Sequence, residues 1–85
     1  MMSIENLEKI GNRWTKNGMD RVYFSFKTLE DICDKYNDGV VPMNRRQRET
    51  FKLWVDLENG EVGAKNAGNL EEELKQWTKK YIEEA

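Results

Sequence analysis

Few residues of this 85-residue chain have the types and spacing that catalysis or metal binding requires. The chain has no histidine, so it lacks the side chain whose ordinary pKa best suits proton transfer near neutral pH. Its one cysteine, Cys33, falls on the apolar stripe of an expected helix, which is typical of a core thiol and not of a nucleophile. The stretch 34–39 partly resembles a calcium loop, but Tyr36 occupies the third ligand position and Arg45 stands where the closing glutamate belongs. We therefore predict a protein that is not an enzyme and uses no metal or cofactor.

Basic and aromatic residues instead share one side of two expected strand pairs, with an arginine cluster beside them. Exposed rings stack on bases and Arg or Lys meet phosphates, so this pattern predicts a surface for single-stranded nucleic acid. The predicted surface comprises Arg13, Arg21, Tyr23, Arg45, Arg46, Arg48, Lys52 and Trp54. Arg13 belongs to it only in a register that buries Trp14. The alternative is that these side chains simply cover the open side of a small sheet.

The first element that must position these residues is a hairpin over about residues 12–26. Its tip, Asn17-Gly18, has the favoured chemistry of a two-residue turn, which would pair Trp14 with Arg21. A three-residue loop would instead pair Trp14 with Val22 and bury it. We favour the three-residue loop, because burial of a tryptophan should outweigh turn preference.

Three further elements follow from hydrophobic periodicity. A helix over about 29–37, started by Thr28, has an apolar stripe at helical spacing. A second hairpin over about 51–64 alternates apolar and polar residues and turns at Asn59-Gly60, which pairs Val55 with Ala64. A second helix covers about 70–83. Short helices over 3–10 and 44–50, capped by a serine and an asparagine, are further alternatives to irregular chain.

The predicted fold class is α+β, a ββα-ββα two-layer sandwich within a single domain of residues 1–85. Its four-stranded, mainly antiparallel sheet should carry two helices on one face. The predicted core comprises Val22, Phe24, Phe26, Leu29, Ile32, Cys33, Tyr36, Phe51, Leu53, Val55, Leu57, Leu70, Leu74 and Trp77.

Composition and charge set the remaining expectations. The net charge is −2, with 35% charged residues, and acidic residues concentrate in the two main helices. These acids form a second candidate surface, for a protein partner, comprising Asp31, Asp34, Asp38, Glu71, Glu72 and Glu73. A single cysteine indicates a reducing, cytoplasmic compartment, and no apolar run is long enough for a membrane span. An unpaired sheet edge is compatible with either a monomer or a dimer.

A hairpin motif runs Trp14-x-Lys16-x-Gly18-Met19-x-Arg21-x-Tyr23-Phe24. It resembles small, uncharacterised proteins of phages and mobile elements that carry a comparable W-x-K…R-x-Y-F hairpin. Small phage proteins often act by binding and blocking a host machine, and anti-CRISPR proteins are examples. The resemblance implies a non-catalytic protein that binds a protein or a protein–nucleic-acid complex in the host cytoplasm, as an inhibitor of a defence complex. The alternative remains direct binding of single-stranded nucleic acid.

Overall fold

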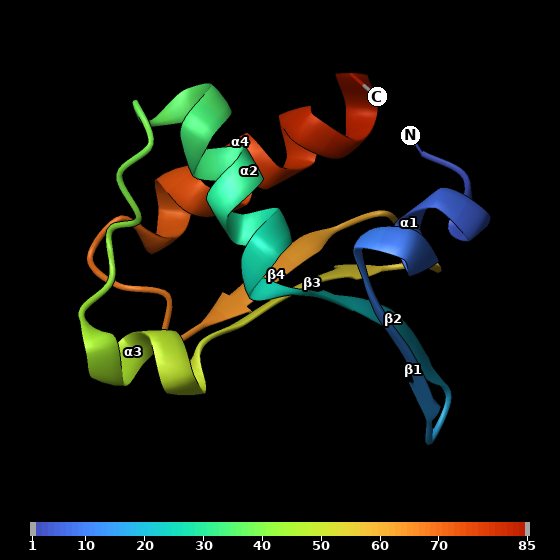
Figure 1. Cartoon of the computed structure of the whole chain (residues 1–85). Coiled ribbons are helices and arrows are strands. Elements are labelled where there is room, and N and C mark those ends of the chain that lie inside the picture. Colours follow the sequence, from blue (N-terminus) through green and yellow to red (C-terminus); the bar gives the residue numbers. More distant parts are fainter. Residues whose placement is uncertain (1, 85) are drawn as a thin grey trace.

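Four helices and a four-stranded antiparallel sheet make up the fold, which confirms the predicted α+β class. A computed structural model describes residues 2–84 (Figure 1). In chain order the elements are α1 (Ile4–Ile10), β1 (Gly11–Lys16), β2 (Met19–Phe24), α2 (Phe26–Tyr36), α3 (Arg45–Thr50), β3 (Lys52–Asp56), β4 (Val62–Lys65) and α4 (Glu71–Glu84). The strands lie in the order β1-β2-β3-β4, each antiparallel to its neighbour. Among residues 2–84, no helix has the length and apolar character that crossing a membrane would demand.

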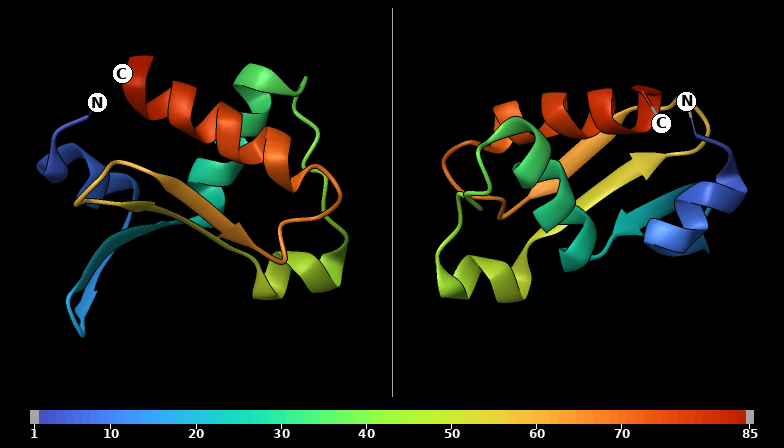
Figure 2. Two further views of the ribbon diagram at one scale, coloured as in Figure 1. Left: turned by 180° about the vertical axis from the view of Figure 1, so that it is seen from behind. Right: turned by 45° about the horizontal axis from the view of Figure 1, so that its top comes forward.

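Helices α2 and α4 lie together on one side of the sheet, and α1 sits beside the first hairpin on that side (Figures 1 and 2). We call this side the covered face and the opposite side the open face. The chain ends meet on the covered side, where the amide of Met2 donates to the carbonyl of Ile82 at 2.9 Å. Helix α3 and the tip of the first hairpin extend from opposite ends of the sheet, both away from α4 (Figure 2). The open face therefore lies between two protruding elements.

The core fills the space between the covered face and the helices. Its buried apolar residues are Leu7, Val22, Phe24, Leu29, Ile32, Cys33, Met43, Leu53, Val55, Ala67, Leu74 and Ile82. Most of the predicted core is confirmed, although five predicted members are only half-buried against it: Phe26, Tyr36, Phe51, Leu57 and Trp77. Leu70 is half-buried and lies outside this cluster, and α4 begins one residue later than predicted.

Side-chain caps explain where three of the helices begin. Ser3, Ser25 and Asn44 each accept a hydrogen bond from a backbone amide of the first helical turn. The predicted start of α2 at Thr28 is wrong, since Ser25 is the cap and β2 ends at Phe24. The Thr28 hydroxyl is instead buried and donates to the carbonyl of Ile10 at 2.7 Å. The helix considered for residues 44–50 is present as α3, with a reciprocal capping box.

The predicted register of the first hairpin is wrong. Trp14 pairs with Arg21 and Arg13 with Val22, as a two-residue turn requires. Both turn residues have positive φ, 53° at Asn17 and 80° at Gly18, which this turn type needs. A shift of one residue moves every β1 side chain to the other face, so Trp14 lies on the open face and Arg13 on the covered face.

The register of the second hairpin also differs from the prediction, but here no side chain changes face. Val55 pairs with Val62 and not with Ala64, so the chain reverses over residues 57–61. The Asp56 carboxylate supports this longer loop by accepting a hydrogen bond of 2.9 Å from the amide two residues on. The register has shifted by two residues, so each side chain keeps its predicted face.

Candidate nucleic-acid interface

The open face brings together aromatic and basic side chains from all four strands. Face parity places there Asn12, Trp14, Lys16, Met19, Arg21, Tyr23, Lys52, Trp54, Asp56, Gly63 and Lys65. The predicted site residues Arg21, Tyr23, Lys52 and Trp54 are thus confirmed to share one face, although their role in binding stays a prediction. Four of the face residues are cations and one is an acid, in a chain of net charge −2. The charge is therefore distributed unevenly between the two sides of the sheet.

Trp54, at the centre of the face, is half-buried and packed on both β2 and β4. Its cross-strand partner on β4 is Gly63, and a Cβ atom on Gly63 would collide with the indole ring. The guanidinium carbon of Arg21 lies 4.7 Å from the centroid of the indole, within cation–π range. The ring of Tyr23 is 5.6 Å away and tilted by 47°. The indole of Trp54 therefore packs within the sheet surface and is not a free ring on which a base could stack.

Arg21 is held by aromatic groups and, among residues 2–84, by no carboxylate. Its Nη1 donates to the Tyr23 hydroxyl at 3.1 Å, and its Nε is buried without a hydrogen-bond partner among residues 2–84. Asp56 is its cross-strand neighbour, yet the two form no ion pair in the described chain. The positive charge of Arg21 is thus positioned on the open face without being neutralised.

Trp14 is the accessible aromatic residue of this face, with 38% of its surface exposed. Its ring meets that of Tyr23 edge to face, with centroids 6.3 Å apart and planes at 85°. Trp14, Tyr23 and Lys52 line a hollow of about 340 Å³. That volume falls at the lower end of the range of about 300–1,000 Å³ typical of small-molecule pockets.

The cations of the open face lack ion-pair partners within the described residues. Lys52 lies directly opposite Lys65 on β4, an arrangement of like charges that destabilises a sheet. The ion pairs of residues 2–84 involve cations away from this face, namely Arg13, Lys27, Lys35 and Lys75. The open face therefore carries positive charge that an external anion would neutralise.

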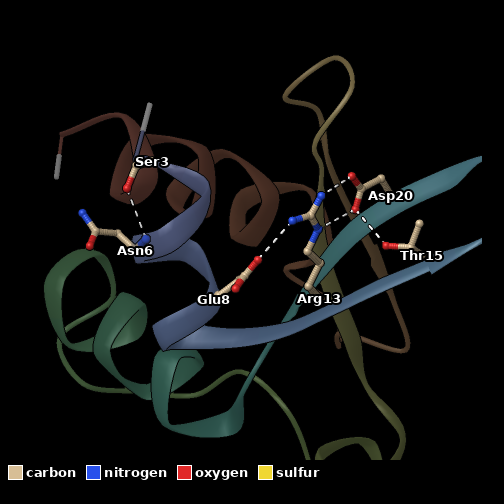
Figure 3. Close-up of polar contacts among 6 residues, drawn as sticks. All are labelled: Ser3, Asn6, Glu8, Arg13, Thr15 and Asp20. Carbon is tan, nitrogen blue, oxygen red and sulfur yellow. Dashed lines mark hydrogen bonds and ion pairs between the residues drawn. The ribbon is translucent and has the colours of Figure 1, made fainter.

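Arg13, which we predicted for this surface, lies on the other side (Figure 3). Its guanidinium contacts Glu8 of α1 at 3.2 Å and binds both carboxylate oxygens of Asp20, at 2.8 and 3.0 Å. The hydrogen bonds from Arg13 hold the pKa of Asp20 below its ordinary value. Arg13 therefore fastens α1 to the first hairpin, and its predicted place in the open-face site is wrong.

The arginine cluster of α3 divides into two parts. Arg45 and Arg46 are exposed at the end of the sheet from which β3 begins, just before Lys52. Arg48 turns toward the body of the protein, where its guanidinium lies 5.9 Å from the ring of Phe26 and its Nε donates to the carbonyl of Met43. Arg45 and Arg46 thus extend the positive charge beyond the sheet, whereas Arg48 also packs on Phe26.

The acids predicted to meet a protein partner belong to the helical layer and its adjoining loop. Two of them are neutralised within the chain, Asp31 by Lys27 at 2.7 Å and Glu72 by Lys75 at 2.9 Å. The others, Asp34, Asp38, Glu71 and Glu73, form no ion pair among residues 2–84. The acidic surface therefore carries less unpaired negative charge than a count of its residues predicts.

Cys33 is buried in the core, as predicted, and burial raises the pKa of its thiol. A buried thiol with a raised pKa forms little of the thiolate that attacks substrates. Within residues 2–84, no three His, Cys, Asp or Glu side chains gather in a way that would hold a metal ion.

Comparisons with known proteins identify no relative of this chain. No protein-family model, curated protein or solved structure matches the chain.

The sequence interpretation missed Trp14, Lys16 and Lys65 as members of the site. Trp14 and Lys16 were missed because the three-residue register turned β1 over. The signal that could have found them is the Asn17-Gly18 turn itself, whose two-residue geometry sets the register. Lys65 was missed because the second hairpin was expected to end at residue 64.

Proposed function

We propose that this protein is not an enzyme and binds single-stranded nucleic acid through the open face of its sheet. The observation that carries the proposal is the pair Lys52 and Lys65, which face each other across β3 and β4 and form no ion pair among residues 2–84. Such a pair costs stability unless an anion joins it. A phosphate backbone supplies anions at regular spacing, and the neighbouring aromatic side chains supply contacts for bases.

The form of the surface favours single strands over duplexes. The aromatic groups lie on the open face of the sheet, which is flanked by α3 and by the tip of the first hairpin (Figure 1). Rings in that position reach bases only when the bases are unpaired and splayed out, as in other sheet surfaces that bind single strands. A duplex would present phosphates alone to the lysines and leave Trp14 unused.

The proposal is tested by titrating single-stranded and duplex oligonucleotides at about 50 and 200 mM salt and following tryptophan fluorescence. We expect tighter binding of single strands, weakening steeply with salt because phosphate contacts release counterions. Lys52→Glu should weaken binding and reduce the salt slope by about one or more, since it removes a phosphate contact. Lys80→Glu, the same charge change on exposed α4, should leave both unchanged. No binding at low salt, or equal loss in the two variants, would contradict the proposal.

The second candidate is the protein partner implied by the resemblance of the first hairpin, including a host defence complex that a phage-type protein would inhibit. What supports it is the group of unpaired acids on the helical layer, of which Glu73 is an exposed example. A partner bound by these acids should be lost with Glu73→Lys and retained with Lys52→Glu. The reverse result in a binding assay would favour the open face.

A further inference from the structure

The hollow beside Trp14 has the form of a corner. Trp14 and Tyr23 provide two aromatic walls at 85° to each other, and Lys52 provides the third side. A flat ligand can stack on one of two perpendicular rings, and its edge then meets the other ring. The corner is therefore shaped for one planar group and not for a continuous stack of them.

Trp14 is the wall that can supply the stacking face. It is exposed, whereas Tyr23 is half-buried and its hydroxyl is already engaged by Arg21. The next ring along the row, Trp54, is packed on Gly63 and lies against Arg21. A second base has no free ring on which to continue the stack within this row.

We infer that the corner formed by Trp14, Tyr23 and Lys52 binds a single unstacked base of a nucleic-acid strand, while Lys52 and Lys65 neutralise phosphates beside it. This inference rests on the proposed function and deepens it. The charge of the surroundings agrees, because Lys52 lines the hollow, Lys65 lies opposite Lys52 on β4, and neither forms an ion pair within the described chain. The base is thereby recognised by its flat face, so binding should tolerate changes of sequence.

The experiment uses the shortest single strand that keeps full affinity, found by truncation, so that the strand cannot slide to another register. Sites of this kind cover about 4–16 nucleotides. An abasic residue is then placed at each position in turn and the dissociation constant is measured. We expect one position to lose on the order of 10-fold in affinity, the effect of losing one stacked base, and the others to lose much less.

Two variants link that position to the corner. Trp14→Ala should weaken the intact strand by a similar factor and flatten the abasic profile, because the stacking face is gone. Trp14→Phe keeps a ring and should preserve the profile, and it also controls for damage to the hairpin. Circular dichroism of both variants establishes that the fold is retained.

The outcomes separate this inference from the proposed function. An even profile in the wild-type protein, or a single sensitive position that persists in Trp14→Ala, would overturn the corner while leaving nucleic-acid binding intact. Absence of binding to any strand at low salt would overturn both.

Discussion

The two faces of the sheet differ in whether their charged side chains form ion pairs. On the covered face, Arg13 forms ion pairs with Glu8 and Asp20, which neutralise its charge. On the open face, Lys52 and Lys65 confront each other across β3 and β4 without an acid in ion-pair contact among residues 2–84. The difference indicates that the covered face is arranged for stability, whereas the open face retains charge at a cost in stability. A surface that keeps an unfavourable charge pair is a better candidate for binding than one in which every charge is satisfied.

The largest difference in the free energy of unfolding is expected between variants of two neighbouring residues of β3 that point to opposite faces. Leu53→Ala should lower the free energy of unfolding by about 2–5 kcal/mol, because it leaves a cavity in the core. Lys52→Ala should leave the free energy of unfolding unchanged or slightly raised, since it relieves repulsion with Lys65. Chemical denaturation followed by tryptophan fluorescence measures both. Similar losses in the two variants would contradict the division of the sheet into two faces.

A smaller effect should distinguish the two tryptophans of the open face. Trp54→Ala should lower the free energy of unfolding by about 1–3 kcal/mol, less than a fully buried tryptophan, because the indole is half-buried. Trp14→Ala should cost clearly less, since that ring is exposed on a protruding hairpin. Thermal unfolding of the two variants provides the comparison. If Trp14→Ala proved the more destabilising, Trp14 would be a packing residue and not a free wall of the hollow.

The smallest expected effect concerns the pH dependence of the covered-face ion pair. Because Arg13 lowers the pKa of Asp20, the pair stabilises the fold above the ordinary pKa of an aspartate. That stabilisation is lost as the pH falls through the lowered pKa. A titration of the Asp20 carboxyl carbon by NMR should show a pKa below the ordinary aspartate value, and Arg13→Gln should bring it back. An ordinary pKa in the wild-type protein would mean that the ion pair does not persist in solution.

Much of the fold could be predicted because local signals and periodicity agreed. The alternation of Leu53 and Val55 and the helical spacing of Leu29, Ile32 and Cys33 placed these residues in the core correctly. The bounds of the elements were harder to predict. Ser25 rather than Thr28 caps α2, because its side chain accepts a hydrogen bond from the first turn. Phe51 follows α3 instead of starting β3, because its backbone amide still donates to the carbonyl of Gln47 at the end of the helix.

The candidate site was predicted in part, for a reason that lies in the two hairpins. An error of two residues in the second hairpin left Lys52 and Trp54 on their predicted face. An error of one residue in the first hairpin exchanged Arg13 for Trp14. Strand side chains alternate with a period of two, so only the odd error changes what a face presents.

The sequence by itself determined the types of the main elements, most of the core and the faces of β2 and β3. It did so because those strands carry a clear apolar side that must be buried. Only the tertiary structure decided between the two registers that the sequence allowed for the first hairpin, and with them the face of β1. On the covered side of β1, Glu8 of α1 pairs with Arg13, and the Asn17-Gly18 turn sets the register that places Trp14 on the open face. The accessible ring of the proposed binding surface thus follows from the register of the first hairpin and from the partner that α1 gives to Arg13, which hydrophobic pattern alone does not specify.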